Sequence, residues 1–146
     1  LSNQHAAAKR CVLTQALGGM KFSRYPQLDL DWLARDLSGF LAIFTTAGHG
    51  FAPSGLDSHE DPHSAAMEHI PTPNWGSQAV WSDYAKAGLY CYDWQESTGT
   101  YVQMAGPVAS PSPELIAQFG DHQIPYEFPF KFSEVQEIAE GDWSAT

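Results

Sequence analysis

Apolar residues in the first half of the chain concentrate in two short runs, Trp32–Ala34 and Phe40–Thr46. The polar segment between them ends in Gly39, which can adopt the positive φ that a tight connection requires. This pattern predicts a β-hairpin. No polar residue interrupts residues 40–44, so the second strand is expected to be buried on both faces.

A second hairpin is predicted from residues 89–94 and 100–105, whose strands alternate in polarity around a turn that closes at Gly99. Short helices are predicted on either side of it. Residues 77–86 have an apolar side that carries aromatic residues, and residues 113–119 follow a serine and begin with proline, as the first turn of a helix often does.

Proline and polar residues dominate the remaining segments. Residues 53–75 form a long polar region with one helical piece around residues 64–69, and a loop of this length is uncommon unless it is functional or disordered. Residues 124–132 are aromatic and extended, but Pro125 and Pro129 restrict them to an edge strand or an irregular one.

The order of these elements predicts an α+β fold, with an antiparallel sheet built from two β-hairpins and short helices packed on it. Residues 133–138 are expected to add a last helical turn. Residues 1–19 differ in character from the rest and are expected to be an upstream extension or a segment introduced by cloning, and residues 20–146 are expected to form a single α+β domain.

The net charge of the chain limits the kinds of binding partner that we expect. The net charge is −10, and every carboxylate side chain lies at Asp29 or later, whereas four of the seven Lys and Arg residues precede it. Nucleic acid and anionic membrane surfaces are disfavoured as partners because both require clustered basic residues. Two interpretations remain open: the charge serves solubility alone, or it attracts a basic protein.

The two cysteines, Cys11 and Cys91, form no C-x-x-C pair, so the sequence contains no zinc or redox motif. A reduced cytoplasmic protein is expected. Cys91 lies between two tyrosines in a predicted strand and is interpreted as a small core residue. No apolar run approaches the ~18 residues of a membrane span.

Histidines cluster in the polar region, where they alternate with carboxylates: His49, His59, His63 and His69. A helix would place His59 and His63 on one face, as metal ligation can require, but Pro62 lies between them and the order His-Glu-x-x-His is absent. No Gly-x-Ser-x-Gly motif exposes a nucleophile either. We therefore expect neither an enzyme nor a bound cofactor. The alternative is a metal-dependent enzyme or a metal-binding protein that uses these histidines.

Aromatic residues interleave with carboxylates in the second half of the chain. Such a mixture suits an interface with a basic protein, where Trp and Tyr anchor the contact and acids complement the charge. Trp81, Tyr90 and Tyr92 are expected to belong to the core instead. The candidate partner-binding residues are Asp83, Tyr84, Asp93, Trp94, Glu96, Trp75, Glu60 and Asp61.

Four motifs together carry a resemblance to a known class of protein. They are PxLDxDWLAxD at residues 26–36, GFLAIFTTAG at 39–48, WxxxAxxGLYxYD at 81–93 and YxxxAxP at 101–107. In these features the chain, from about Met20 to Phe132, resembles small bacterial immunity proteins of secreted polymorphic toxins. The resemblance implies a cytoplasmic, non-enzymatic inhibitor that binds its cognate toxin and occludes the toxin's active site. It implies no particular contact residues, because the contacts of each immunity protein are specific to its toxin.

Overall fold

The computed structural model describes residues 22–25, 27–54, 56, 60–119, 126–128 and 130–139, with the backbone alone at residues 60 and 61. The predicted extension at residues 1–19, Cys11 and His59 lie outside the described residues. The fold is α+β, as predicted.

The main sheet is strongly curled, like half of a barrel, and has the strand order β7-β2-β3-β5-β6-β8. Its strands are β2 (Asp31–Asp36), β3 (Leu41–Thr45), β5 (Leu89–Gln95), β6 (Thr100–Ala105), β7 (Glu127–Phe128) and β8 (Glu137–Ile138). A separate two-stranded sheet pairs β1 (Phe22–Arg24) with β4 (Phe51–Pro53). The helices are α2 (Glu60–Met67), α3 (Val80–Lys86), α4 (Pro113–Phe119) and the 3₁₀ helix η2 (Phe132–Glu134).

Both predicted hairpins are present, but the sheet that they form is mixed rather than antiparallel. β2 pairs antiparallel with β3 around a turn in which Gly39 has a φ of +88°, and β5 pairs antiparallel with β6. The two hairpins join through a parallel pairing of β3 with β5, and the edge strand β7 is parallel to β2. The cause is the connection between the hairpins, which passes through β4, α2 and α3. A crossover of that length can return the chain in its original direction.

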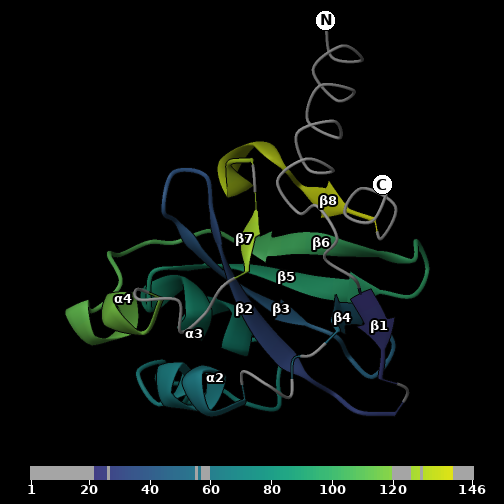
Figure 1. Ribbon diagram of the computed structural model, residues 1–146, viewed down its shortest axis with the longest axis horizontal. Coiled ribbons are helices and arrows are strands. Elements are labelled where there is room, and N and C mark those ends of the chain that lie inside the picture. Colours follow the sequence, from purple (N-terminus) through teal and green to yellow (C-terminus); the bar gives the residue numbers. More distant parts are fainter. Residues whose placement is uncertain are drawn as a thin grey trace, which may run out of the picture.

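Side chains alternate between two covered faces of this sheet. On one face, Trp32 stacks on Phe44 with 4.2 Å between the ring centroids, and Phe44 stacks on Tyr92 at 4.9 Å. The opposite face, which carries Leu33 and Ile43, packs against α2, α3 and α4. Figure 1 shows the three helices together on one side of the sheet, with the segment that contains η2 on the other. β3 is therefore buried on both faces, as its unbroken apolar run predicts.

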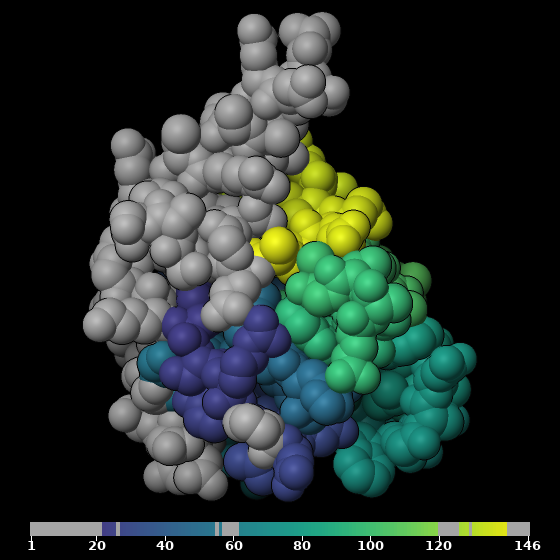
Figure 2. All heavy atoms as spheres, turned by 90° about the vertical axis from the view of Figure 1, so that its right-hand side faces the viewer, coloured from purple at the N-terminus to yellow at the C-terminus, as the bar shows by residue number. Residues whose placement is uncertain are grey.

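Tyrosine hydroxyls connect the aromatic face to the small sheet. Tyr101 donates a hydrogen bond to the carbonyl of Phe51 (2.5 Å) and accepts one from the Trp32 indole nitrogen (3.2 Å). The Arg24 guanidinium lies 4.8 Å above the Trp94 ring. Figure 2 accordingly shows β1, in purple, beside the green β5–β6 hairpin. Buried polar groups thus find partners inside an aromatic core.

The helix predictions hold with shifted boundaries. α3 ends at Lys86, and Gly88, whose φ is +91°, follows its C-cap residue. The Ser112 hydroxyl accepts the Leu115 amide at the start of α4. α2 begins at Glu60, earlier than predicted, so Pro62 falls in the first turn, where a missing N–H costs little. At the C-terminal end, η2 and β8 replace the expected last helical turn.

Three further core predictions concern single residues. Cys91, Tyr90 and Tyr92 are buried, which confirms them as core residues, and Cys91 is a free thiol. Trp81 is partly buried against the helix-covered core rather than enclosed by it. That partial exposure leaves Trp81 available at a surface described below.

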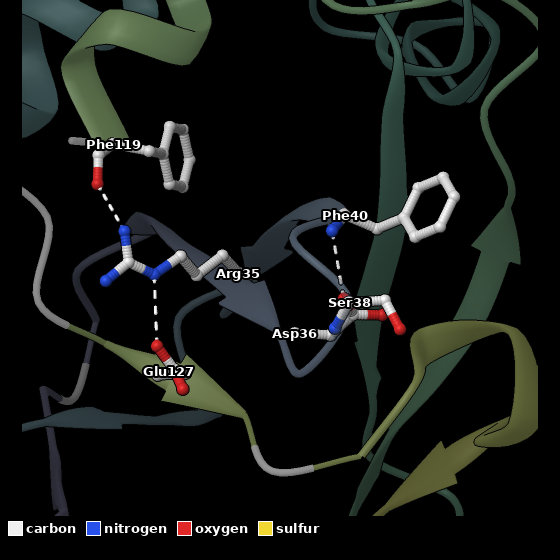
Figure 3. Close-up of polar contacts among 6 residues, drawn as sticks. All are labelled: Arg35, Asp36, Ser38, Phe40, Phe119 and Glu127. Atoms are coloured by element: carbon white, nitrogen blue, oxygen red, sulfur yellow. Dashed lines mark hydrogen bonds and ion pairs between the residues drawn. The ribbon is translucent and has the colours of Figure 1, made fainter.

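The buried Asp36 carboxylate holds the end of the first hairpin to the C-terminal segment. One of its oxygens accepts the amides of Ser38 and Phe40, each at 2.9 Å (Figure 3). The other oxygen accepts the amide of Phe132 at 2.8 Å. Beside it, the partly exposed Arg35 guanidinium pairs with Glu127 at 3.2 Å. Three charge-assisted hydrogen bonds compensate the burial of Asp36, whereas solvent screens the Arg35 pair.

We predict that Asp36→Ala lowers the free energy of unfolding by on the order of 3 kcal/mol, because one buried amide and two partly buried amides lose their acceptor. Urea denaturation measures the change. Glu127→Gln, which removes only the exposed ion pair, should cost less than about 1 kcal/mol. Equal effects of the two substitutions would contradict a structural role of the Asp36 network.

Candidate functional site

A cavity of about 470 Å³ opens where β2 begins, between the helix-covered face of the sheet and the turn that precedes α3. We call it the acidic pocket. Its lining includes three carboxylates, Asp29, Asp31 and Asp93, and three aromatic side chains, Trp75, Trp81 and Tyr84. Cavities of this size are typical of sites that hold a small ligand or a single side chain.

Strand register brings the carboxylates together. Asp31 on β2 is the partner of Thr45 on β3, and Thr45 is the partner of Asp93 on β5. Partners in register project to the same side of a sheet, and residues two apart in an extended chain do so as well. The side chains of Asp31, Thr45 and Asp93 therefore form one polar row, which Asp29 extends at the mouth of the pocket.

Two carboxyl groups of this row have raised pKa values. Burial raises the pKa of Asp31 to about 7, and the neighbouring carboxylates of Asp29 and Asp93 add to the rise. Burial also raises the pKa of Asp93, although the Thr45 hydroxyl opposes the shift by donating a hydrogen bond to its carboxylate at 2.5 Å. A positive charge in the pocket would favour the ionised form of both groups.

The aromatic wall has one protruding residue and one enclosed residue. Trp75 is 75% exposed, whereas Tyr84 is only 2% exposed. The Tyr84 hydroxyl has no hydrogen-bond partner within the described part of the chain. Burial, followed by the charge of Asp31, raises its pKa well above its usual range, so the phenol remains neutral.

The position of Trp75 depends on Asp83. Its carboxylate accepts two hydrogen bonds from Asn74, one from the backbone amide and one from the side-chain amide, both at 2.8 Å. Asp83 is itself buried on α3. A short helix thus fixes the residue immediately before the exposed indole.

The residues that the sequence singled out for partner binding fall in different places. Trp75, Tyr84 and Asp93 meet in the acidic pocket. Asp83 and Trp94 are buried, with Asp83 bonded to Asn74 as described above.

Glu96 lies apart from the pocket, in the turn between β5 and β6, where it pairs with His49 at 3.3 Å. Glu60 and Asp61 begin α2, and their side chains lie outside the described part of the structure. The predicted set is therefore divided among the pocket, the core and two other segments.

Sequence reasoning missed most of the other residues that line the pocket, among them Asp29, Asp31, Thr45 and Trp81. From the sequence alone, Asp29 and Asp31 are interpreted as neighbouring carboxylates on the surface. Their proximity to Asp93 follows from the parallel pairing of β3 with β5, which joins segments far apart in sequence. The available signal was that the apolar runs at residues 32–34 and 89–92 are each bordered by an aspartate, Asp31 and Asp93.

The histidine metal site that the sequence left as an alternative does not form among the residues that the structure describes. No group of three or more His, Cys, Asp or Glu in that part could hold a metal ion. His49 pairs with Glu96, and His63 is buried with its ring 5.7 Å from the ring of Tyr126. Of the four histidines, His59 lies outside the described residues, and His69 lies within them.

Comparisons of the chain with protein-family models, with curated proteins and with solved structures found no match. Within the described residues, no helix is long and apolar enough to cross a membrane. The acidic pocket is therefore the feature on which a functional proposal can rest.

The raised pKa of Asp31 predicts a pH-dependent cost of folding. The folded state holds the proton up to about pH 7, whereas an unfolded aspartate loses it near pH 4. The unfolded state binds fewer protons in this window, so stability falls as the pH rises through it and stays low above. We predict that Asp31→Asn is more stable than the wild type by on the order of 2 kcal/mol at pH 8, and about equal to it at pH 4.

Thermal and urea denaturation of both proteins at the two pH values measure this difference. Glu114→Gln, at an exposed position on α4, is the matched control and should change stability little at either pH. A gain for Asp31→Asn that is the same at pH 4 and pH 8 would refute the electrostatic origin.

Proposed function

We propose that this chain is a non-enzymatic binding protein that neutralises a bacterial toxin by direct contact, as an immunity protein does. The observation that carries the proposal is the acidic pocket with the exposed Trp75 at its edge. Two features are unfavourable in the free protein: a large indole exposed to water, and a cluster of carboxylates beside it. Both features become favourable when a partner covers the ring and supplies a positive charge.

The charge of the whole chain supports a basic partner. A net charge of −10 produces a field that accelerates association with a basic surface and disfavours acidic ones. Toxins that act on nucleic acid or on other anionic substrates need basic active sites. An acidic inhibitor could occlude such a site by presenting carboxylates where the substrate would otherwise bind.

The surroundings of the pocket suit an interface better than a reaction centre. Tyr84 is held neutral, and Thr45 occupies one oxygen of Asp93. No cofactor is required for the proposed role. The resemblance of the sequence to immunity proteins agrees with this function and with action in the cytoplasm, where a producing cell would need protection.

An affinity purification of the tagged protein from its source cells, followed by mass spectrometry, tests the proposal. We expect one basic protein in stoichiometric amount. The same purification with the pocket variants described next must lose that protein, because co-purification alone does not locate the interface. A partner that is retained by every pocket variant would contradict the proposed interface.

We predict that Asp29→Lys and Trp75→Ala each weaken binding of the partner by at least about tenfold. The first variant places a positive charge at the mouth of the pocket, and the second removes the exposed anchor. Isothermal titration calorimetry measures the change. Both residues are exposed, and neither side chain makes a hydrogen bond within the described part, so folding should be little affected.

Two charge reversals elsewhere serve as controls. Glu114→Lys on α4 and Glu96→Lys in the β5–β6 turn should each change the affinity by less than about threefold. If Glu96→Lys abolished binding while both pocket variants bound normally, the interface would lie at the β5–β6 turn instead.

A further inference from the structure

We infer that the acidic pocket receives one arginine side chain, whose guanidinium contacts the carboxylates of Asp31 and Asp93 and lies against the ring of Trp75. The inference rests on the proposed function in one respect, because the binding partner supplies the arginine. The pocket itself, however, can be tested with a small probe and without the partner.

Two polar groups of the pocket have no hydrogen-bond partner among the described residues, which favours a ligand that donates hydrogen bonds. Tyr84 is only 2% exposed and lines the cavity, yet its hydroxyl makes no hydrogen bond to any described residue. The partly buried Asp31 carboxylate has no hydrogen-bond partner in that part of the structure either. Both groups can therefore accept hydrogen bonds from the N–H groups of a ligand that enters the pocket.

The placement of the acceptors favours a guanidinium over an ammonium. Asp31 and Asp93 stand on strands separated by β3, which places the two strands roughly 9–10 Å apart. A planar fork with five N–H donors can address acceptors on several sides, whereas an ammonium is a compact point charge. The guanidinium plane can also stack on an exposed indole. Trp75 provides such a ring at the edge of the cavity.

A metal ion is a less suitable occupant for a geometric reason. The described carboxylates and histidines include no group of three that could coordinate one ion. The lining also includes three aromatic side chains, which offer no ligand oxygen apart from one neutral phenol. A guanidinium can interact with both parts of the lining, because its charge pairs with the carboxylates and its planar face stacks on the aromatic rings.

Binding of the cation is coupled to a proton. Asp31 has a pKa of about 7, so below neutral pH a guanidinium must displace the proton before it can pair with the carboxylate. Affinity should therefore fall by about tenfold from pH 8 to pH 6. The titratable groups that face Asp31 are Asp29, Asp93, Tyr84 and Cys91 around the acidic pocket, and His63 and Glu68 across a neighbouring cavity that Asp31 also lines.

The experiment titrates the full chain with N-acetyl-L-arginine amide, followed by the indole N–H signals of Trp75 and Trp81 in two-dimensional NMR spectra. The matched probes are the citrulline analogue, which has the same shape without the charge, and the lysine analogue. We expect shifts at both indoles, with the arginine probe binding at least tenfold more tightly than citrulline and severalfold more tightly than lysine at pH 8.

Variants then assign the contacts. Asp31→Asn should weaken binding of the arginine probe at least tenfold at pH 8 and abolish its dependence on pH, whereas Glu114→Gln should change neither. A dependence on pH that persists in Asp31→Asn would assign the proton to His63 or Glu68 and overturn the role given to Asp31. The spectrum of each variant reports directly whether it is folded.

Three results would overturn the inference: no shift at the two indoles with 50 mM probe at pH 8, equal binding of citrulline, or equal binding of lysine. These results leave the proposed function testable, because a toxin could still bind the surrounding surface and lose affinity with Trp75→Ala. Conversely, a pocket that binds the arginine probe in a chain with no pocket-dependent protein partner would support the site and refute the immunity role.

Discussion

The parallel pairing of β3 with β5 is the constraint on which the rest of the structure depends. It requires the chain to leave the first hairpin, pass through α2 and α3, and return in the same direction, which places the helices over one face of the sheet. It also aligns Thr45 with Asp93, and so brings Asp93 to the side of the sheet that carries Asp31. With an antiparallel pairing the same residues would have met different partners, and the acidic pocket would not exist.

The two faces of the sheet contribute differently to stability. The aromatic face is closed by stacked rings and by tyrosine hydroxyls that bond to backbone carbonyls, an arrangement that favours a single rigid core. The helix-covered face includes partly buried carboxylates near one end, where desolvation and then their mutual repulsion oppose folding. A protein can retain such a destabilising cluster only when burial elsewhere offsets it, and the extensive aromatic core provides that burial.

Local features were predictable from the sequence, and long-range ones were not. The hairpin around Gly39, the helix after Ser112 and the burial of Cys91 follow from patterns within a few residues. The joining of the two hairpins does not, because parallel register depends on the packing of a long crossover. For the same reason the sequence identified Asp93 and Trp75 as candidates but treated Asp29 and Asp31 as an ordinary surface pair.

The hydrogen bonds between Asp83 and Asn74 affect the entropy that would be lost when a partner binds. An indole on a free loop would have to give up its motion when a partner bound, and that lost entropy would subtract from the affinity. Here two hydrogen bonds from Asn74 to a buried carboxylate set the backbone beside Trp75 before any encounter. The entropy of ordering this loop is thus lost during folding, and a partner of the proposed kind would meet Trp75 on an already ordered backbone.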